Sequence, residues 1–263
     1  MISMTLPSFA NLRITFLLIV LTVVALTSLH QRVYSRNWNQ PLQVTVFPIN
    51  ADGHLETADY IDQLETATFS QIDRWGVREA KRHNLALTTP FSVTLGAQIH
   101  ELPPAFPAQN PNELDVLFWG LRFRWWAYRH TPEDGNGLTR VRMFAMYHEG
   151  EPDVALAHSL GMQKGLMGLV HLFADAEQTQ QNNIVIAHEM LHTVGAIDKY
   201  DNFGNPAYPW GYSAPNRAPL YPQRNAEIMA GRIATSSYSS YMAESLRSVV
   251  VNKHTADEIN WIE

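Results

Sequence analysis

The chain has 263 residues, of which 46% are hydrophobic and 11% aromatic, so it can bury the core of one large domain or two small ones. Its 19 basic and 25 acidic side chains give a formal net charge of -6, which is not the basic excess expected of a protein that binds nucleic acid. The absence of cysteine excludes disulfides, cysteine-ligated metals, thiol nucleophiles and a lipidated cysteine.

The N-terminus carries an uncharged and largely apolar run at residues 14–29. Arg13 precedes this run, and Arg32 and Arg36 follow it, so the charge distribution does not decide its orientation in a membrane. The length of the run lies between that of a secretory signal core and that of a full membrane span.

No convincing cleavage site accompanies this run, because residues 25–27 match the small-residue pattern of a signal peptide poorly. We therefore favour an uncleaved signal anchor, with its flanks, at residues 1–36 over a cleaved signal peptide. Segments of this type usually direct the remainder of the chain across the membrane. The sequence thus predicts that residues 37–263 lie outside the cytoplasm, anchored to the membrane, or secreted if the segment is cleaved.

The rest of the chain predicts a mixture of strands and helices after a polar linker at residues 31–41. Alternating apolar and polar residues indicate strands, whereas apolar residues at intervals of three and four indicate helices. Residues 111–129 fit both patterns, and we prefer a helix because Asn110 and Pro111 form a typical helix start. The expected strands are 42–47, 91–99, 140–147 and 166–173, and the expected helices are 57–82, 111–129, one that begins near Gln178, 239–250, and a short last one at 255–258. Loops are expected at residues 102–111, 131–137 and 200–225.

The strongest signal is the motif H-E-x-x-H-x-x-G-x-x-D that begins at His188. On a helix, His188 and His192 project from the same face, so both can bind one metal ion. Glu189 lies beside them, close enough to take a proton from a metal-bound water. Gly195 can end the helix, because glycine tolerates the left-handed backbone of a turn, and the carboxylate of Asp198 can then supply a third ligand. Three protein ligands and a water are typical of a catalytic zinc site.

This motif resembles that of the metzincin clan of zinc endopeptidases, in which the last position is usually histidine. Here Asp198 occupies that position, and the snapalysin branch, which also uses aspartate, is more similar. Metzincins further have a methionine turn beneath the metal, and Met229 in the segment AEIMAG at residues 226–231 resembles it. The resemblance covers about residues 184–231.

The resemblance implies an α+β fold, namely a metzincin-like zincin domain with a twisted mixed sheet, a motif helix and a loop-rich C-terminal half. It implies a zinc metallopeptidase that hydrolyses peptide bonds in protein or peptide substrates. The cofactor would be Zn²⁺. The residues implied for the site are the metal ligands His188, His192 and Asp198, the general base Glu189, and the supporting residues Gly195 and Met229.

The third ligand has alternatives, because Asp201 and Glu227 are further carboxylates near the motif. Asp201 comes one helical turn late, and Glu227 would fit a clan whose third ligand is a distant glutamate. Tyr200, Tyr238 and Tyr241 could stabilise an oxyanion, although such tyrosines more often pack with their hydroxyls hydrogen-bonded.

Other residues before the motif also allow two interpretations. The predicted strand at residues 166–173 is either the edge that pairs with an extended substrate or an interior strand. Three histidines are expected to be ordinary core or surface residues, namely His148, His158 and His171. Three tryptophans fit core packing better than an apolar binding site or a membrane contact, namely Trp119, Trp125 and Trp126.

Two other functions remain open at this point. A catalytically silent metal-binding or protein-interaction module of the same fold would keep the ligands, but it would have no need of Glu189 beside them. A metal-dependent hydrolase of another bond, such as an amide in a cell wall, would use the same residues. We expect a peptide or protein substrate and, through the N-terminal segment, a membrane as partners.

Overall fold

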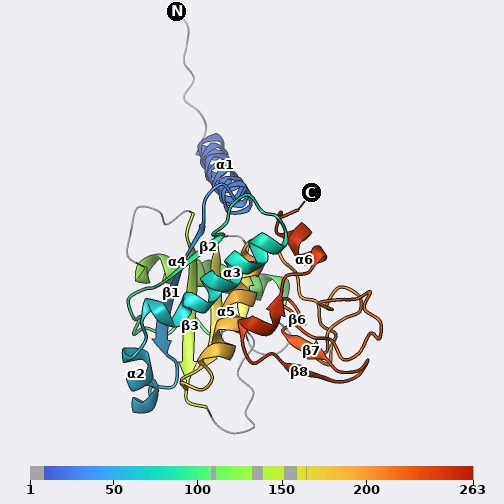
Figure 1. Cartoon of the computed structure of the whole chain (residues 1–263). Helices are drawn as coiled ribbons and strands as arrows, with labels where there is room; N and C mark the ends of the chain where they lie inside the picture. Colours follow the sequence, from blue (N-terminus) through green and yellow to red (C-terminus); the bar gives the residue numbers. More distant parts are fainter. Residues whose placement is uncertain (1–8, 108–110, 132–138, 151–158, 164, 263) are drawn as a thin grey trace, which may run out of the picture.

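The computed structural model describes residues 9–107, 111–131, 139–150, 159–163 and 165–262. Within this part of the chain, a five-stranded mixed sheet has the order β2-β1-β3-β5-β4. Figure 1 shows β1, β2 and β3 side by side. Its strands are β1 (Leu42–Asn50), β2 (Phe91–Leu95), β3 (Val141–His148), β4 (Leu160–Met162) and β5 (Met167–Phe173). Four strands are parallel, and β4 pairs antiparallel with β5 at the edge. The predicted mixed sheet and N-terminal apolar helix are confirmed.

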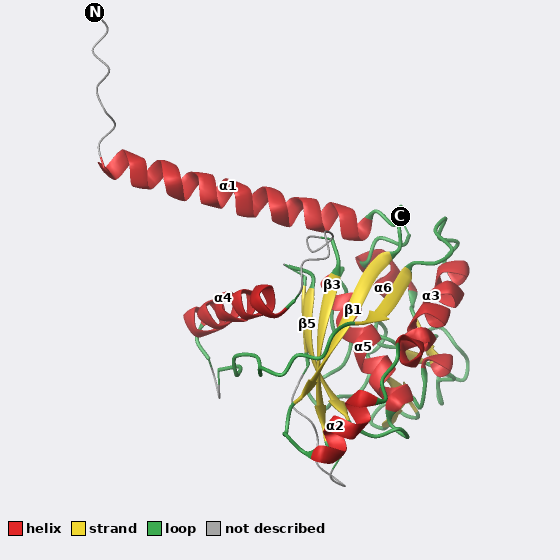
Figure 2. Cartoon of the chain, turned by 90° about the vertical axis from the view of Figure 1, so that its left-hand side faces the viewer, coloured by secondary structure: helices red, strands yellow, loops and turns green. Residues whose placement is uncertain are grey.

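Helices cover both faces of the sheet. On one face, α2 (Leu55–Asp62), α3 (Ser70–Arg82) and α5 (Thr179–Thr193) share one core with the sheet. On the other face, α4 (Glu113–His130) packs alone, and its buried aromatic residues meet Phe47 and Phe144. Figure 2 shows α4 and α3 on opposite sides of the strands. The predicted choice of a helix over a strand for this segment is confirmed, but its predicted start at Pro111 is wrong, because Asn112 caps the helix and Glu113 is its first residue. Asn110 lies outside the described residues.

The predicted single helix at residues 57–82 is wrong. The chain leaves α2 after Asp62 and forms a short 3₁₀ segment, η1 (Thr66–Phe69), before α3 begins. Glu65 and Thr68 exchange side-chain and backbone hydrogen bonds in a capping box, which starts a new helix. Helical periodicity continues across this break, so the pattern of apolar residues did not reveal it.

The N-terminal helix α1 (Phe9–Arg36) extends through half of the predicted linker. The linker prediction is wrong there, because Gln31 and Ser35 are buried against the domain. Just after the helix, the buried indole of Trp38 packs edge-on against Trp261. The segment Asn11–Arg36 contains an 18-residue stretch with a mean hydropathy of 2.3 and is long and apolar enough to cross a membrane.

The C-terminal half is loop-rich. After α5, residues 200–225 form the expected long loop, and two small sheets follow. In one, β6 (Ala226–Glu227) pairs with β9 (Val249–Val250), and in the other β7 (Arg232–Ala234) pairs with β8 (Ser240–Met242).

The predicted helix at residues 239–250 is wrong. This segment instead contains β8, a 3₁₀ turn, η2 (Leu246–Ser248), and β9. Ser245 caps the turn, and the β-branched Val249 and Val250 pair with β6. The last helix, α6 (Lys253–Glu258), starts two residues before the predicted one, behind the cap Asn252.

Candidate metal site

The helix α5 brings His188 and His192 together on one face, as the spacing predicts. Their Nε2 atoms are 3.1 Å apart, and both side chains are only about one-sixth exposed or less. Each Nδ1–H donates to a backbone carbonyl, from His188 to Ile228 at 2.9 Å and from His192 to Ala196 at 2.8 Å. These bonds fix the ring orientations and leave both Nε2 lone pairs directed at a common point.

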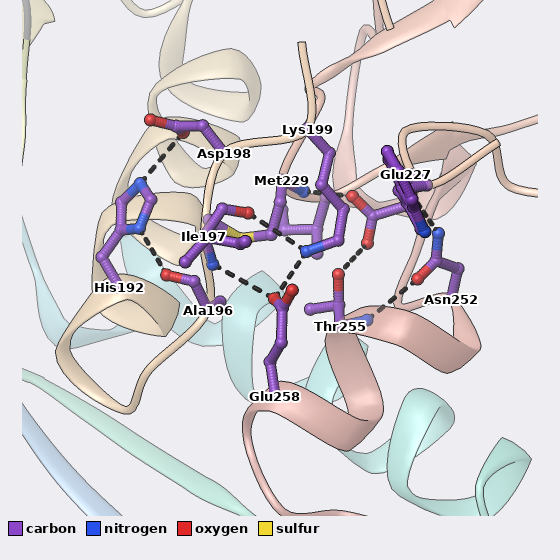
Figure 3. A network of polar contacts seen from close by, with 12 residues as sticks. His192, Ala196, Ile197, Asp198, Lys199, Glu227, Met229, Asn252, Thr255 and Glu258 are labelled. Carbon is purple, nitrogen blue, oxygen red and sulfur yellow. Dashed lines mark hydrogen bonds and ion pairs between the residues drawn. The ribbon is translucent and has the colours of Figure 1, made fainter. Parts of the chain in front are cut away.

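Asp198 completes this group after a turn. The helix ends at Thr193, and Gly195 has a φ of 109°, which is a conformation that residues with a side chain rarely adopt. The chain reverses there, and Asp198 Oδ1 lies 3.1 Å from the Nε2 atom of each histidine. Figure 3 shows its contact with His192. The predicted role of Gly195 as the end of the helix is therefore confirmed.

The three atoms at this point form a triangle that protons alone do not satisfy. Because both histidines donate from Nδ1, both Nε2 atoms are acceptors unless a ring carries a second proton. If one imidazole carries a proton on Nε2, it can donate across two of the three contacts, but the third contact still joins two acceptors. If both imidazoles carry such a proton, their two N–H groups face each other. A single cation at the centre satisfies all three contacts.

The dimensions of the triangle suit a zinc ion. With 3.1 Å sides, each corner lies about 1.8 Å from the centre, close to the bond length of about 2.0–2.1 Å that zinc would require. This is the length of zinc bonds to imidazole nitrogen and carboxylate oxygen. The donor set and its spacing therefore fit Zn²⁺.

Glu189 faces the same point from the buried side of the helix. It is 6% exposed, and its carboxylate lies with the two imidazoles in a group whose ligand atoms are within 4.8 Å of one another. Asp198 approaches the imidazoles more closely, which makes it the better third ligand. Among the described residues, Glu189 Oε2 is one of the few buried side-chain atoms without a hydrogen-bond partner.

Burial and charge act in opposite directions on these groups. Burial raises the pKa of Glu189, although the two histidines partly offset this effect. Burial also disfavours ionisation of Asp198, but its hydrogen bonds to the two histidines hold its pKa well below the usual range. For His188, burial lowers the pKa, yet Asp198 and Glu189 together raise it above its ordinary value. The site thus favours a positive charge between the two histidines and Asp198.

The segment around Met229 lies against this site. Ile228, its neighbour, supplies the carbonyl that orients His188. Met229 is fully buried, and its carbonyl accepts the N–H of Lys199, one residue after Asp198. Its own N–H donates to Glu227 at 2.6 Å. The turn therefore holds both His188 and the loop that carries Asp198.

A buried polar network that sequence reasoning missed fixes this loop (Figure 3). The carboxylate of Glu258 on α6 accepts the N–H of Ile197 at 3.1 Å and the ammonium of Lys199 at 2.5 Å, and so binds the chain on both sides of Asp198. The Lys199 side chain is only 3% exposed. Nothing in the sequence near the motif indicates that Glu258 is its partner.

The edge strand β4 crosses the motif helix at close range. A Cβ atom on Gly161 would lie 2.4 Å from the carbonyl of Glu189 and 2.5 Å from Cβ of His192, so only glycine permits this approach. The strand is therefore the true edge next to the site. The candidate strand β5 is interior over Met167–Leu169, where it pairs with β3 and β4.

A cavity of about 330 Å³ opens beside Glu189 and His188. Its walls include Val185 of α5, His171 of β5, and Arg232 just after the Met229 turn. The lining is more apolar than polar, so it suits a side chain or a small organic group.

The alternative third ligands lie elsewhere. Glu227 is fully buried and accepts from Thr255 and from the Met229 N–H, and Asp201 accepts the N–H groups of Phe203 and Asn205. Tyr200 lies near the site, where burial and the Asp198 carboxylate raise its pKa to about 12.

The remaining candidates are not part of the triangle. Tyr238 and Tyr241 are exposed on the β7–β8 hairpin. His148 and His171 contact each other, with Nε2 and Nδ1 2.9 Å apart, and burial lowers the pKa of His171 to about 4. His158 lies outside the described residues. Two of the three tryptophans, Trp119 and Trp126, are buried, whereas Trp125 is 62% exposed.

No family model matches the sequence, and no curated protein is significantly similar to it.

Proposed function

We propose that the protein is a zinc-dependent peptidase of the metzincin type, with His188, His192 and Asp198 as metal ligands. The observation that carries this proposal is the triangle of three acceptor atoms at 3.1 Å, which a cation satisfies and protons do not. The methionine turn against His188 and the antiparallel edge strand over α5 support the same type. Zinc bound there would supply a Lewis acid and lower the pKa of a water at the open position.

Glu189 performs the proton transfers in this proposal. Its buried Oε2 is free to accept a proton from the attacking water, and the raised pKa of its carboxyl favours holding that proton. It then delivers the proton to the leaving amine. A site that only stored a metal would gain nothing from a buried carboxylate beside its ligands, so Glu189 favours a hydrolase over a silent binding module.

The surroundings of the triangle fit an extended peptide. Within the described part of the chain, β4 leaves its outer edge unpaired, so a peptide can add to it as a further strand. Gly161 keeps this edge in contact with α5, which brings the peptide backbone next to Glu189. The cavity beside Glu189 can then receive one substrate side chain.

We further propose that α1 anchors the enzyme in a membrane, with the domain outside the cytoplasm. The apolar surface of α1 supports this, because the most apolar part of the helix makes no contact with the domain. A domain held in this way would act on peptides or proteins near the membrane surface.

The experiment that tests the activity compares the full chain in detergent with Glu189→Gln. We expect equal zinc content by elemental analysis and cleavage of a peptide library by the wild type alone. The control is Glu177→Gln, an exposed carboxylate before α5, which should leave both measurements unchanged. Zinc in both proteins with cleavage in neither would identify a silent metal-binding module, and absence of zinc from both would overturn the proposal.

A further inference from the structure

The outer face of α4 is apolar. Six large side chains occur at intervals of three and four residues along this helix, and each is more than half exposed. They are Leu114, Leu117, Phe118, Leu121, Trp125 and Tyr128. In a helix on the surface of a water-soluble domain, this face would carry polar residues. A continuous apolar face of this size marks an interaction surface.

The other face of α4 fixes the helix on the sheet. Trp119, Phe123 and Trp126 are at most 6% exposed, and Phe123 and Trp126 pack against Phe144 of β3. The apolar outer face is therefore held outward by a packed inner face. Because both faces are apolar, burial in the domain accounts for only one of them.

Two observations indicate what covers the outer face. Figure 2 shows α1 extending from the domain toward the side of the sheet on which α4 lies. The apolar helix that can cross a membrane and the apolar face of α4 are thus on one side of the molecule.

The second observation is the composition of the α4 face. Trp125 and Tyr128 stack on each other with ring centroids 6.1 Å apart, and the exposed Arg122 and Arg129 accompany them. Tryptophan and tyrosine are enriched at the level of lipid headgroups, and arginine extends from apolar surfaces toward phosphates. This combination is typical of a helix that lies in the membrane interface.

We propose that the outer face of α4 rests on the lipid bilayer that α1 crosses. This inference depends on the proposed membrane anchorage but goes beyond it, because an anchor alone leaves the domain free to rotate. A second contact through α4 fixes the orientation of the domain. Since α5 packs on the opposite face of the sheet, the metal site is held on the side of the sheet that faces away from the lipid.

The absence of cysteine makes a direct test possible, because one introduced cysteine carries one spin label. The full chain is placed in nanodiscs of phosphatidylcholine and phosphatidylglycerol in a ratio of three to one. Labels at Leu121→Cys and Leu117→Cys report on α4, and a label at Val20→Cys reports on α1. Val77→Cys is the matched control, an exposed aliphatic position on α3. The measurement is the collision rate of each label with oxygen, which concentrates in lipid, and with a water-soluble nickel chelate.

We expect the ratio of oxygen to nickel collisions to be at least tenfold higher at both α4 positions than at Val77, and similar to that at Val20. If the α4 labels resemble Val77 while Val20 is in lipid, the inference is overturned and the anchorage stands. Protection from both reagents at α4 would mean that protein, such as a second copy of the chain, covers the face, which also overturns it. A water-exposed Val20 would remove the anchorage and the inference together.

Discussion

Local helix geometry positions His188 and His192 in the candidate metal site, whereas contacts between distant parts of the chain position Asp198. The two histidines lie on one helix, whose backbone hydrogen bonds join residues only four positions apart. Asp198 lies in a loop, and Glu258, which holds this loop, is 59 positions from the Lys199 that it binds. Two of the proposed ligands are therefore positioned by local structure, whereas the third depends on the folding of the whole C-terminal half.

The largest effect is expected for His192→Ala, which removes a proposed ligand and leaves the helix intact. Alanine favours helix, and the imidazole is partly exposed, so the fold should persist. Zinc affinity should fall by more than about a hundredfold, since loss of an outer partner alone costs about 10–100-fold. A competition titration against a chelator measures this, with circular dichroism as the control for folding. Unchanged affinity would remove His192 from the ligand set.

The next largest effect is expected at Glu227, in the C-terminal half of the chain, and it is a pH dependence of the free energy of unfolding. Burial raises the pKa of Glu227 to about 7 against the hydrogen bond from Thr255 and the charge of Lys199. Between pH 4.5 and about 7, Glu227 stays protonated in the folded protein. In the unfolded chain it has its ordinary pKa of 4.5 and is therefore ionised. Relative to Glu227→Gln, the free energy of unfolding should therefore fall by an amount on the order of 2–3 kcal/mol as the pH rises from about 4.5 to 7.

Urea unfolding of both proteins across this pH range measures the difference between them. The difference should be constant below pH 4.5 and above about pH 7. A difference that does not change with pH would show that Glu227 stays ionised in the fold.

A smaller effect is expected for Glu258→Gln. Glutamine can still accept the N–H of Ile197, but it leaves the buried ammonium of Lys199 without its counter-charge. Because this changes the support of a ligand and not the ligand itself, we expect zinc affinity to fall by about 10–100-fold.

The control for this variant is Glu79→Gln. Glu79 is a buried carboxylate on α3 that accepts the N–H of Val251 and pairs with Arg78. Its loss should lower the melting temperature and leave zinc affinity unchanged. Equal loss of zinc affinity in both variants would mean that Glu258 acts only through general stability.

The smallest effect is expected where the helix and the loop meet, at Gly195. Alanine there would adopt an unfavourable φ, and its Cβ would lie 3.2 Å from Gln163 Nε2 and 3.3 Å from the Glu258 carbonyl. We expect a loss of about 1–2 kcal/mol of stability by thermal or urea unfolding. Gly53→Ala is the matched control, since Gly53 also has a positive φ but nothing within 4 Å of its Cβ position. A smaller loss at Gly195 than at Gly53 would contradict the contribution of these contacts.

The sequence predicted the part of the site that local geometry determines. The motif fits into eleven residues, so the positions of His188, Glu189 and His192 followed from helical spacing, and Gly195 predicted the turn. Asp198 was one of three candidates, and only the folded chain separates it from Asp201 and Glu227. Lys199 and Glu258 were missed because a contact between residues far apart leaves no periodic pattern.

The same limit explains the errors in the fold. Strands β1, β2, β3 and β5 were predicted because each has at least five residues, whereas β4 has three and was missed. The helix predicted at residues 239–250 failed because apolar spacing fits both a helix and short strands. The sequence predicted α4, but its apolar residues surround the helix, so only the structure reveals which face lies outward.

The end of α1 has a consequence for making a shortened form of the protein. Arg36 donates to the carbonyl of Glu258 and accepts from the side chain of Asn260, and the indole of Trp38 donates to the carbonyl of Ile259 at 2.7 Å. The end of α1 and the residues just after it are thus bonded to the helix that holds the loop of Asp198. A soluble version should begin before Gln31, and any purification tag at the C-terminus needs a spacer after Trp261.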